Sequence, residues 1–316
     1  MENKRYTVYS QYLKKKYGEK VYKLPVHIPA TCPNRDGTTG DGGCIFCGDV
    51  AAGFEMLSDR LSVKQQIEQN MQYIGQKYNV RKFIVYFQNF TNTYMPLDMF
   101  QRCMTEACEL GIVEIAISTR PDCINETYLQ FLNQLQTERG IQISIELGLQ
   151  TVNYHSLHKI NRGHTLAEFI DAVRRIQKFH FDICTHLIID LPWDTITDVI
   201  ESAKILSALQ INQVKLHSLY VVKGTKLGEW YENQTFTHIE MEEYIKRVVE
   251  FLEYLHPDIA IQRLIGRAPK EDTLFVNWHT SWWKIRDEIE KTLEQLDTYQ
   301  GKKCDYLNGK AVAKYR

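Results

Sequence analysis

Three cysteines share one glycine-rich loop near the amino terminus. Cys32, Cys44 and Cys47 are separated by eleven and two residues, and four glycines lie between the first and the last of them. The loop follows Leu24–Ile28, an apolar segment that we interpret as a strand. Because glycine tolerates positive backbone φ angles, such a loop can wrap closely around a metal cluster. The sequence therefore predicts that three thiolates meet at one end of a sheet.

Three sulfur ligands favour an iron–sulfur cluster over a structural zinc site, which needs a fourth cysteine or histidine nearby. In a [4Fe–4S] cluster, three cysteines leave one iron free for a substrate or a cofactor. Two alternatives remain open. One is a zinc ion whose coordination is completed by His27 or a distant ligand, and the other is three unconnected free cysteines in a core.

The composition is that of a large soluble enzyme. The chain has 316 residues, 44% of them hydrophobic and 24% charged, so it can bury a large core. Its eight cysteines do not form a disulfide framework, its amino terminus lacks an apolar signal region, and no run of about 18 apolar residues occurs. We therefore predict a cytoplasmic protein that does not associate with membranes. The net charge of −1 gives no global sign of a nucleic acid partner.

Six short apolar runs predict parallel strands that alternate with amphipathic helices. After the cysteine loop, successive runs begin about 30 to 40 residues apart, the length of a strand with its crossover helix. From Leu166 to Ile176, apolar residues recur with a helical period. The six runs are Leu24–Ile28, Phe83–Phe87, Val113–Ile117, Ile141–Leu147, Ile183–Ile189 and Val214–Leu219.

These elements predict an α/β fold, a partial (βα)6 barrel of the TIM type. We expect this core to span residues 21–227. An arm over residues 1–20 would precede it, and a mainly helical extension or lid over residues 228–316 would follow.

Polar side chains gather at the carboxyl ends of five predicted strands, where complete barrels carry their chemistry. Ordinary turns and helix capping would explain any single loop, and Asp194 with Thr195 fits a helix cap. Five such loops in succession favour a shared pocket. The segments are Gln88–Tyr94, Ser118–Asp122, Gly148–Thr151 and Asp190–Asp194, together with Lys215 and His217 of the last strand.

The cysteine loop resembles the cluster loop of radical S-adenosylmethionine (SAM) enzymes. The segments Cys32–Gly37 and Gly42–Cys47 are similar to those of the Elp3-like group, and within it to the branch of YhcC and YtqA, also called MnmL. The resemblance implies that Cys32, Cys44 and Cys47 hold a [4Fe–4S] cluster whose free iron binds SAM. The reduced cluster would cleave SAM to methionine and a 5′-deoxyadenosyl radical, which removes hydrogen from the substrate. An external reductant such as flavodoxin or ferredoxin is implied.

Resemblance to SAM-binding barrels of the coproporphyrinogen-dehydrogenase and Elp3 type implies three SAM contacts. Gln150 and Arg162 match a glutamine at the end of the fourth strand and an arginine twelve residues later. An amide can serve ribose hydroxyls, and a guanidinium can clamp a carboxylate. Gln88 falls where such barrels hold the SAM amino group, although the usual Gly-Gly-Glu-like run is absent here. Ser118 and His186 stand where relatives often carry acids.

The carboxyl-terminal extension contains a tryptophan-rich segment, Trp278–Lys284, between two predicted helices, 239–255 and one that includes Ile285 to Leu296. Three tryptophans with a histidine and cations suit stacking on bases and contact with phosphates. The alternative is that the tryptophans pack the extension across the open barrel.

The local sequence features do not indicate the substrate, so the expectation for it comes from the resemblance. Elp3-like proteins act on the wobble uridine of tRNA, which implies tRNA as partner. The YtqA branch is associated with remodelling the C5 side chain of that uridine between the carboxymethylaminomethyl and the aminomethyl or methylaminomethyl forms. Two alternatives stay open: a radical SAM enzyme acting on a small molecule or a protein, and a non-catalytic iron–sulfur or zinc scaffold that binds RNA.

Overall fold

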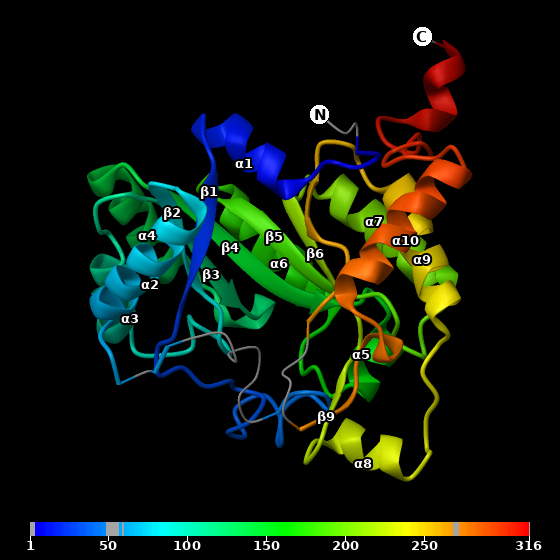
Figure 1. Cartoon of the computed structure of the whole chain (residues 1–316), viewed down its shortest axis with the longest axis horizontal. Coiled ribbons are helices and arrows are strands. Elements are labelled where there is room, and N and C mark those ends of the chain that lie inside the picture. Colours follow the sequence, from blue (N-terminus) through cyan, green and yellow to red (C-terminus); the bar gives the residue numbers. More distant parts are fainter. Residues whose placement is uncertain (1–3, 49–56, 59, 268–271, 316) are drawn as a thin grey trace. The chain divides into compact units, whose positions relative to one another are not determined.

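Seven strands form the main sheet of the protein. The computed structural model describes residues 4–48, 57–58, 60–267 and 272–315. The strand order is β1-β2-β3-β4-β5-β6-β8, which confirms the α/β class and the partial barrel (Figure 1). The strands are β1 (Val21–Val26), β2 (Lys82–Phe87), β3 (Ile112–Thr119), β4 (Gln142–Gln150), β5 (Asp182–Ile188), β6 (Gln213–His217) and β8 (Ala260–Arg263).

Two details of the strand prediction are wrong. The seventh strand, β8, was not predicted, because its four residues end in the polar pair Gln262 and Arg263 and form no apolar run. Strands β1 and β6 end earlier than predicted. Ile28 and Leu219 lie beyond the ends of these strands but are buried. Their apolar side chains extended the runs from which the strands were predicted.

Helices follow most of the strands, as a parallel sheet requires. Several begin at sequence signals: Ser62 and Thr165 each form a capping box with the third residue of their helix. The helices are α1 (Tyr9–Tyr17), α2 (Val63–Tyr78), α3 (Leu97–Glu106), α4 (Glu126–Arg139), α5 (Tyr154–Lys159), α6 (Leu166–Gln177), α7 (Ile196–Ala208), α8 (Lys226–Glu232), α9 (Met241–Tyr254) and α10 (Trp282–Gln295). Two short strands, β7 (Val221–Val222) and β9 (Thr273–Phe275), pair in antiparallel orientation.

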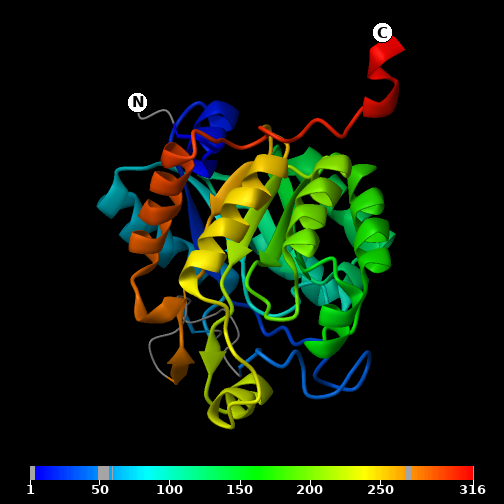
Figure 2. The same cartoon turned by 90° about the vertical axis from the view of Figure 1, so that its right-hand side faces the viewer.

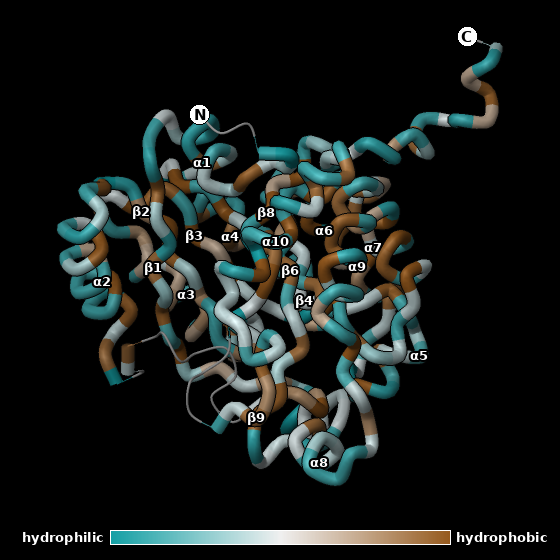
Figure 3. Tube along the Cα trace, turned by 45° about the vertical axis from the view of Figure 1, so that its right-hand side comes forward, coloured by the Kyte–Doolittle hydropathy of each residue, from teal (hydrophilic) through white to brown (hydrophobic). Residues whose placement is uncertain are grey.

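One compact unit comprises residues 10–149 and 158–184. Its strands β1 to β4 pair in parallel, and α2, α3 and α4 lie beside β1 to β3 (Figure 1). Strand β2 is almost entirely buried, as expected of a parallel strand covered on both faces. Along α2, hydrophilic and more hydrophobic residues alternate, so this helix buries only one face (Figure 3). This unit contains the cysteine loop.

The other unit comprises residues 1–9, 150–157 and 185–316. Helix α9 packs between α7 and α10, and Figure 2 shows α9 and α10 running alongside each other. The amino-terminal segment joins this unit, since the Tyr6 hydroxyl donates to Glu290 of α10 at 2.8 Å and Val8 bridges to Ile261. In the described part of the chain, no helix combines the length and the apolarity needed to span a bilayer.

Candidate iron–sulfur and SAM site

The cysteine loop is folded by its own backbone. The Arg35 N–H donates to the Cys32 carbonyl at 2.9 Å, and the Cys47 N–H donates to the Cys44 carbonyl at 2.9 Å, so tight turns hold the cysteines. Gly43 has a φ of +77°, and a Cβ there would lie 3.1 Å from the Arg35 side chain. A larger residue here would strain the backbone and displace the Arg35 side chain, so glycine is favoured at this position.

The three thiols lie close enough to influence one another. Burial, followed by the neighbouring Cys44 thiolate, raises the pKa of Cys47 to about 12, and the charge of Cys32 acts in the same direction. Three thiolates in such a place repel one another unless a bound cation neutralises them. All three are free of disulfides. The donor set therefore fits an iron–sulfur cluster, which carries the required positive charge.

A second segment, residues 160–163, fastens the cysteine loop. The Ile45 N–H donates to the Ile160 carbonyl at 3.1 Å, and Asn161 Nδ2 donates to the Gly43 carbonyl at 2.8 Å. In return, Asn34 Nδ2 donates to the Asn161 carbonyl at 2.5 Å. These bonds bring the segment that carries Arg162 directly against the cysteines.

Two buried arginines face the cysteine sulfurs. Arg162 Nη1 lies 3.4 Å from Cys44 Sγ, and its Nη2 donates to the Gly148 carbonyl at 2.7 Å. Arg120 Nη1 lies 3.9 Å from Cys32 Sγ. Arg162 was predicted as a SAM contact, whereas Arg120 was predicted only as part of the polar segment Ser118–Asp122 that follows β3. The only signal for Arg120 was its position at a polar strand exit.

His164 shares the acceptor of Arg162. Its Nε2 lies 3.1 Å from the Gly148 carbonyl. Burial, together with the positive charges of Arg162 and Arg120, lowers the pKa of His164 to about 3. The imidazole is therefore neutral at physiological pH and adds no charge beside the sulfurs.

Several buried polar atoms of this unit have no hydrogen-bond partner among the described residues. They are Arg162 Nε, Asn34 Oδ1, Asn89 Oδ1 and Thr91 Oγ1. Such atoms are costly unless a ligand pairs with them. A donor and several acceptors at the cysteine loop and the loop after β2 fit the amino and carboxylate groups of SAM. Gln88 begins that second loop, and the neighbouring Asn89 Nδ2 lies 2.9 Å from His27 Nε2.

Gln150 is the last residue of β4 and has a φ of +76°. This left-handed conformation is uncommon for a residue with a side chain and has to be held by its surroundings. The next residue, Thr151, is anchored by Asp194, which accepts hydrogen bonds from Thr151 Oγ1 at 2.6 Å and from the Ser156 hydroxyl. Asp194 is thus not a helix cap; Thr195 alone caps α7.

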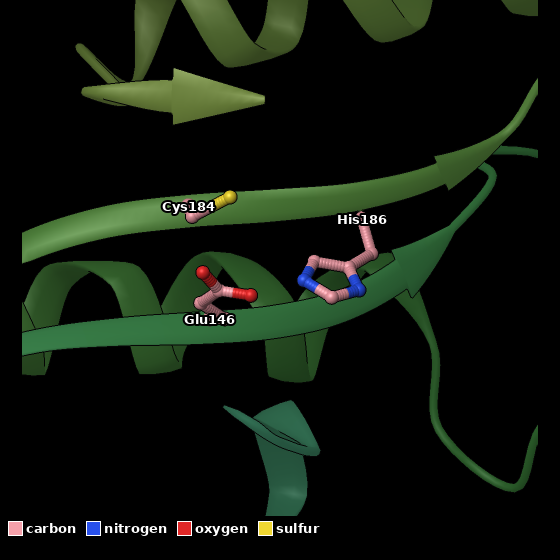
Figure 4. Close-up of side chains that lie close together, drawn as sticks. All are labelled: Glu146, Cys184 and His186. Atoms are coloured by element: carbon pink, nitrogen blue, oxygen red, sulfur yellow. The ribbon is translucent and has the colours of Figure 1, made fainter. Parts of the chain in front are cut away.

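Figure 4 shows a further group of side chains with metal-ligating atoms, Glu146 on β4 with Cys184 and His186 on β5. The ammonium group of Lys23 pairs with the Glu146 carboxylate. Because this charge is already neutralised by a lysine, a metal ion would first have to displace it. We assign no second metal site to these residues.

Asp190, which follows β5, is fully buried. Its Oδ1 accepts the Leu219 N–H at 2.7 Å, while Oδ2 has no partner among the described residues. Burial raises the pKa of Asp190 to about 7, above the ordinary 3.8. Between pH 3.8 and about pH 7, the folded state therefore binds more protons at Asp190 than the unfolded state does. The contribution of Asp190 to stability falls as the pH rises through this range.

We expect Asp190→Asn to gain stability relative to the unchanged protein as the pH rises. From pH 5 to pH 8, the free energy of unfolding of the variant should rise by about 3 kcal/mol relative to that of the unchanged protein, because the amide carries no charge to bury. Urea denaturation midpoints measured across this range would test it. A difference that stays constant with pH would contradict the prediction.

Two sequence profiles of protein families match this chain. The sequence profile of the radical SAM superfamily matches residues 32–206, and that of the radical SAM C-terminal domain matches residues 211–295. The uncharacterized protein MJ0486 of Methanocaldococcus jannaschii is 34% identical over 297 residues, covering 93% of this chain and 90% of its own. The uncharacterized protein YtqA of Bacillus subtilis is 31% identical over 303 residues, covering 95% and 92%.

More distant relatives point to the same group. A tRNA uridine(34) acetyltransferase of Methanocaldococcus jannaschii is 24% identical over 274 residues, covering 72% of this chain and 48% of its own. The solved structure of Methanocaldococcus infernus Elp3 shares the fold with a TM-score of 0.67 at 16% identity, covering 89% of this chain and 64% of that one. The expected resemblance to the Elp3-like group, with its [4Fe–4S] cluster and SAM, is thereby confirmed, and the chain belongs to the radical SAM superfamily.

Proposed function

We propose that this radical SAM enzyme modifies the C5 side chain of the wobble uridine of tRNA, between the carboxymethylaminomethyl and the aminomethyl or methylaminomethyl forms. The observation that carries the proposal is the relative named as a tRNA uridine(34) acetyltransferase, which is similar over 72% of this chain. The shared fold with Elp3 is consistent with it.

The chain's own residues divide the work. Cys32, Cys44 and Cys47 would hold the cluster. Arg162 Nε, together with Gln88 and the loop it begins, would contact SAM, as would Gln150 at the end of β4. Cluster and SAM, when bound, supply a carbon radical that removes one hydrogen atom from the substrate. The burial of Cys44 and Arg162 limits the access of water to the Cys44 sulfur and to the guanidinium. The electron would come from a flavodoxin or ferredoxin.

A cationic and aromatic surface in the carboxyl-terminal unit supports an RNA partner. The guanidinium groups of Arg267 and Arg286 lie 4.4 and 5.4 Å from the ring centre of Trp282. The next residue, Trp283, is 46% exposed, and the Lys284 ammonium lies 5.6 Å from its ring centre. Exposed aromatic rings beside cations suit stacking on bases and contact with phosphates.

Trp278, the first tryptophan of this segment, packs inside the carboxyl-terminal unit instead. Trp278 Nε1 donates to the Ile239 carbonyl at 2.7 Å, and its ring lies 5.2 Å from that of Tyr244. Trp278 therefore has a packing role within this unit. We assign the RNA-contacting role to Trp282 and Trp283.

The test uses tRNA isolated from a strain of the source organism that lacks the gene. Anaerobically reconstituted protein, SAM and dithionite are added, and wobble nucleosides are measured by mass spectrometry together with 5′-deoxyadenosine. We expect the carboxymethylaminomethyl form to decrease and the aminomethyl or methylaminomethyl form to increase in step with 5′-deoxyadenosine. A matched reaction contains tRNA whose wobble base is not uridine, and it should show neither change.

The alternatives predict different results. A radical SAM enzyme for a small molecule or a protein would cleave SAM without changing any wobble nucleoside, in the reaction and in the strain lacking the gene. A scaffold would bind metal and RNA without forming 5′-deoxyadenosine. Either result would contradict the proposed function.

A further inference from the structure

The two arginines beside the cysteines are buried far from solvent. Arg120 is 2% exposed and Arg162 is 7% exposed. Their Nη1 atoms lie 3.9 Å from Cys32 Sγ and 3.4 Å from Cys44 Sγ, distances at which an N–H group donates to sulfur. Two of the three cluster cysteines therefore each face a buried guanidinium.

Both guanidinium groups are held rigidly. Arg120 binds Asp122 through two bonds, Nε to Oδ1 at 2.9 Å and Nη2 to Oδ2 at 2.7 Å, and its Nη1 also donates to the Arg162 carbonyl at 2.8 Å. Arg162 Nη2 donates to the Gly148 carbonyl. To turn away from its sulfur, Arg120 would have to break three of these bonds, and Arg162 would have to break its bond to the Gly148 carbonyl.

The two arginines differ in their charge balance. The positive charge of Arg120 is neutralised by Asp122. Arg162 forms no ion pair within the described residues and donates only to a carbonyl and to Cys44. Asp122 also attracts Arg162 but is directly paired with Arg120. A buried guanidinium that lacks a directly paired anion is unfavourable, so the site favours an anion next to Arg162. The cluster with its cysteine thiolates is the anion that this location supplies.

We propose that Arg162, assisted by Arg120, raises the reduction potential of the iron–sulfur cluster and so eases its one-electron reduction by the external donor. N–H···S bonds and a nearby positive charge stabilise the added electron, and cluster potentials depend on hydrogen bonds to sulfur and on local charge. Arg162 is a positioning and tuning residue in this role. Because Arg120 is already neutralised, its contribution is the smaller one.

The inference depends on the cluster and not on the tRNA substrate. It also differs from the role that the resemblance implies for Arg162, a contact with SAM. If the guanidinium served SAM alone, its loss would weaken SAM binding and leave the cluster potential without SAM unchanged. The two roles are therefore separable by one measurement made in the absence of SAM and tRNA.

The test is a redox titration of the reconstituted full chain, followed by electron paramagnetic resonance of the reduced cluster. For Arg162→Gln, which removes the charge, we expect the ratio of reduced to oxidised cluster at a fixed potential to fall about tenfold, which corresponds to 59 mV for one electron. The double variant Arg120→Gln/Asp122→Asn removes a positive and a negative charge together, and it should change the ratio by less. Arg174→Gln, which removes an exposed charge from α6, should not change it.

Iron and sulfide content is measured for every variant, so that potentials are compared only between chains with complete clusters. A wild-type potential for a fully loaded Arg162→Gln would overturn the inference. If that variant does not assemble a cluster, Arg162→Met decides. It also removes the charge and the N–H groups but keeps most of the side-chain volume, and it should show a potential below that of the unchanged protein. A wild-type value for the methionine variant would then overturn the inference.

Discussion

Replacing Cys44 by alanine is expected to remove the cluster and with it all cleavage of SAM. Cys44 is 7% exposed and accepts hydrogen bonds from Arg162 and Asn34, so no water molecule can readily take its place as a ligand. After anaerobic reconstitution, iron should fall from about four atoms per chain to less than about one. 5′-Deoxyadenosine, measured by chromatography after addition of dithionite and SAM, should fall to background.

The matched control is Cys103→Ala. Cys103 is also a free, partly buried cysteine, but it lies on α3 and not in the cysteine loop. Iron and 5′-deoxyadenosine should stay at the level of the unchanged protein. Four irons retained in Cys44→Ala would contradict the assignment of the ligands. Zinc in place of iron in the unchanged protein would favour the zinc alternative.

Replacing Arg247 by alanine should cause the largest loss of stability. Arg247 of α9 is buried and donates to three backbone carbonyls after β5, those of Ile189 at 3.2 Å, Leu191 at 3.3 Å and Asp194 at 2.9 Å. The substitution leaves these buried acceptors unpaired and opens a cavity. We expect a loss of about 3 to 5 kcal/mol, a large part of the stability of an ordinary protein.

The loss would appear as a lower urea midpoint, while the slope of the free energy of unfolding against urea concentration stays unchanged. Arg247→Lys should lose nearly as much, because one ammonium group cannot reproduce the planar fork that reaches three carbonyls. The neighbouring Lys246→Ala is the control. Among the described residues, Lys246 forms one exposed ion pair, with Glu243 at 3.6 Å, so its removal should change stability by less than about 0.5 kcal/mol. Equal effects for both positions would contradict the role assigned to Arg247.

The fold class was predictable, and the cysteine loop could be recognised as a candidate cluster site, because their signals are local. Apolar runs at regular intervals indicate strands, and the spacing of Cys32, Cys44 and Cys47 with four glycines indicates a cluster loop. The polar exits of the strands were likewise visible, since each follows an apolar run directly. These features depend on residues that are neighbours in the chain.

Contacts between distant segments were not predictable in the same way. Arg120 lies 88 residues from Cys32, and nothing in the pattern of β3 tells that its guanidinium turns toward that sulfur. The hydrogen bonds of Asp194 to Thr151 and Ser156 span about 40 residues, and they replace the capping role that its sequence position suggested. Such details depend on register and rotamer, which a single sequence does not encode locally.

The bonds that fasten the cysteine loop also set an order of events during synthesis. Asn161 and Arg162 lie 118 residues beyond Gly43 and Cys44, their partners in the loop. At ribosomal speeds, the cysteines leave the ribosome roughly 6 to 24 s before the segment that clamps them. The nascent chain therefore presents three thiols without their clamp, and the finished site forms only after β4 and α5 have been made. A cluster inserted before that point would be held by the cysteines without the hydrogen bonds from Asn161 and Arg162.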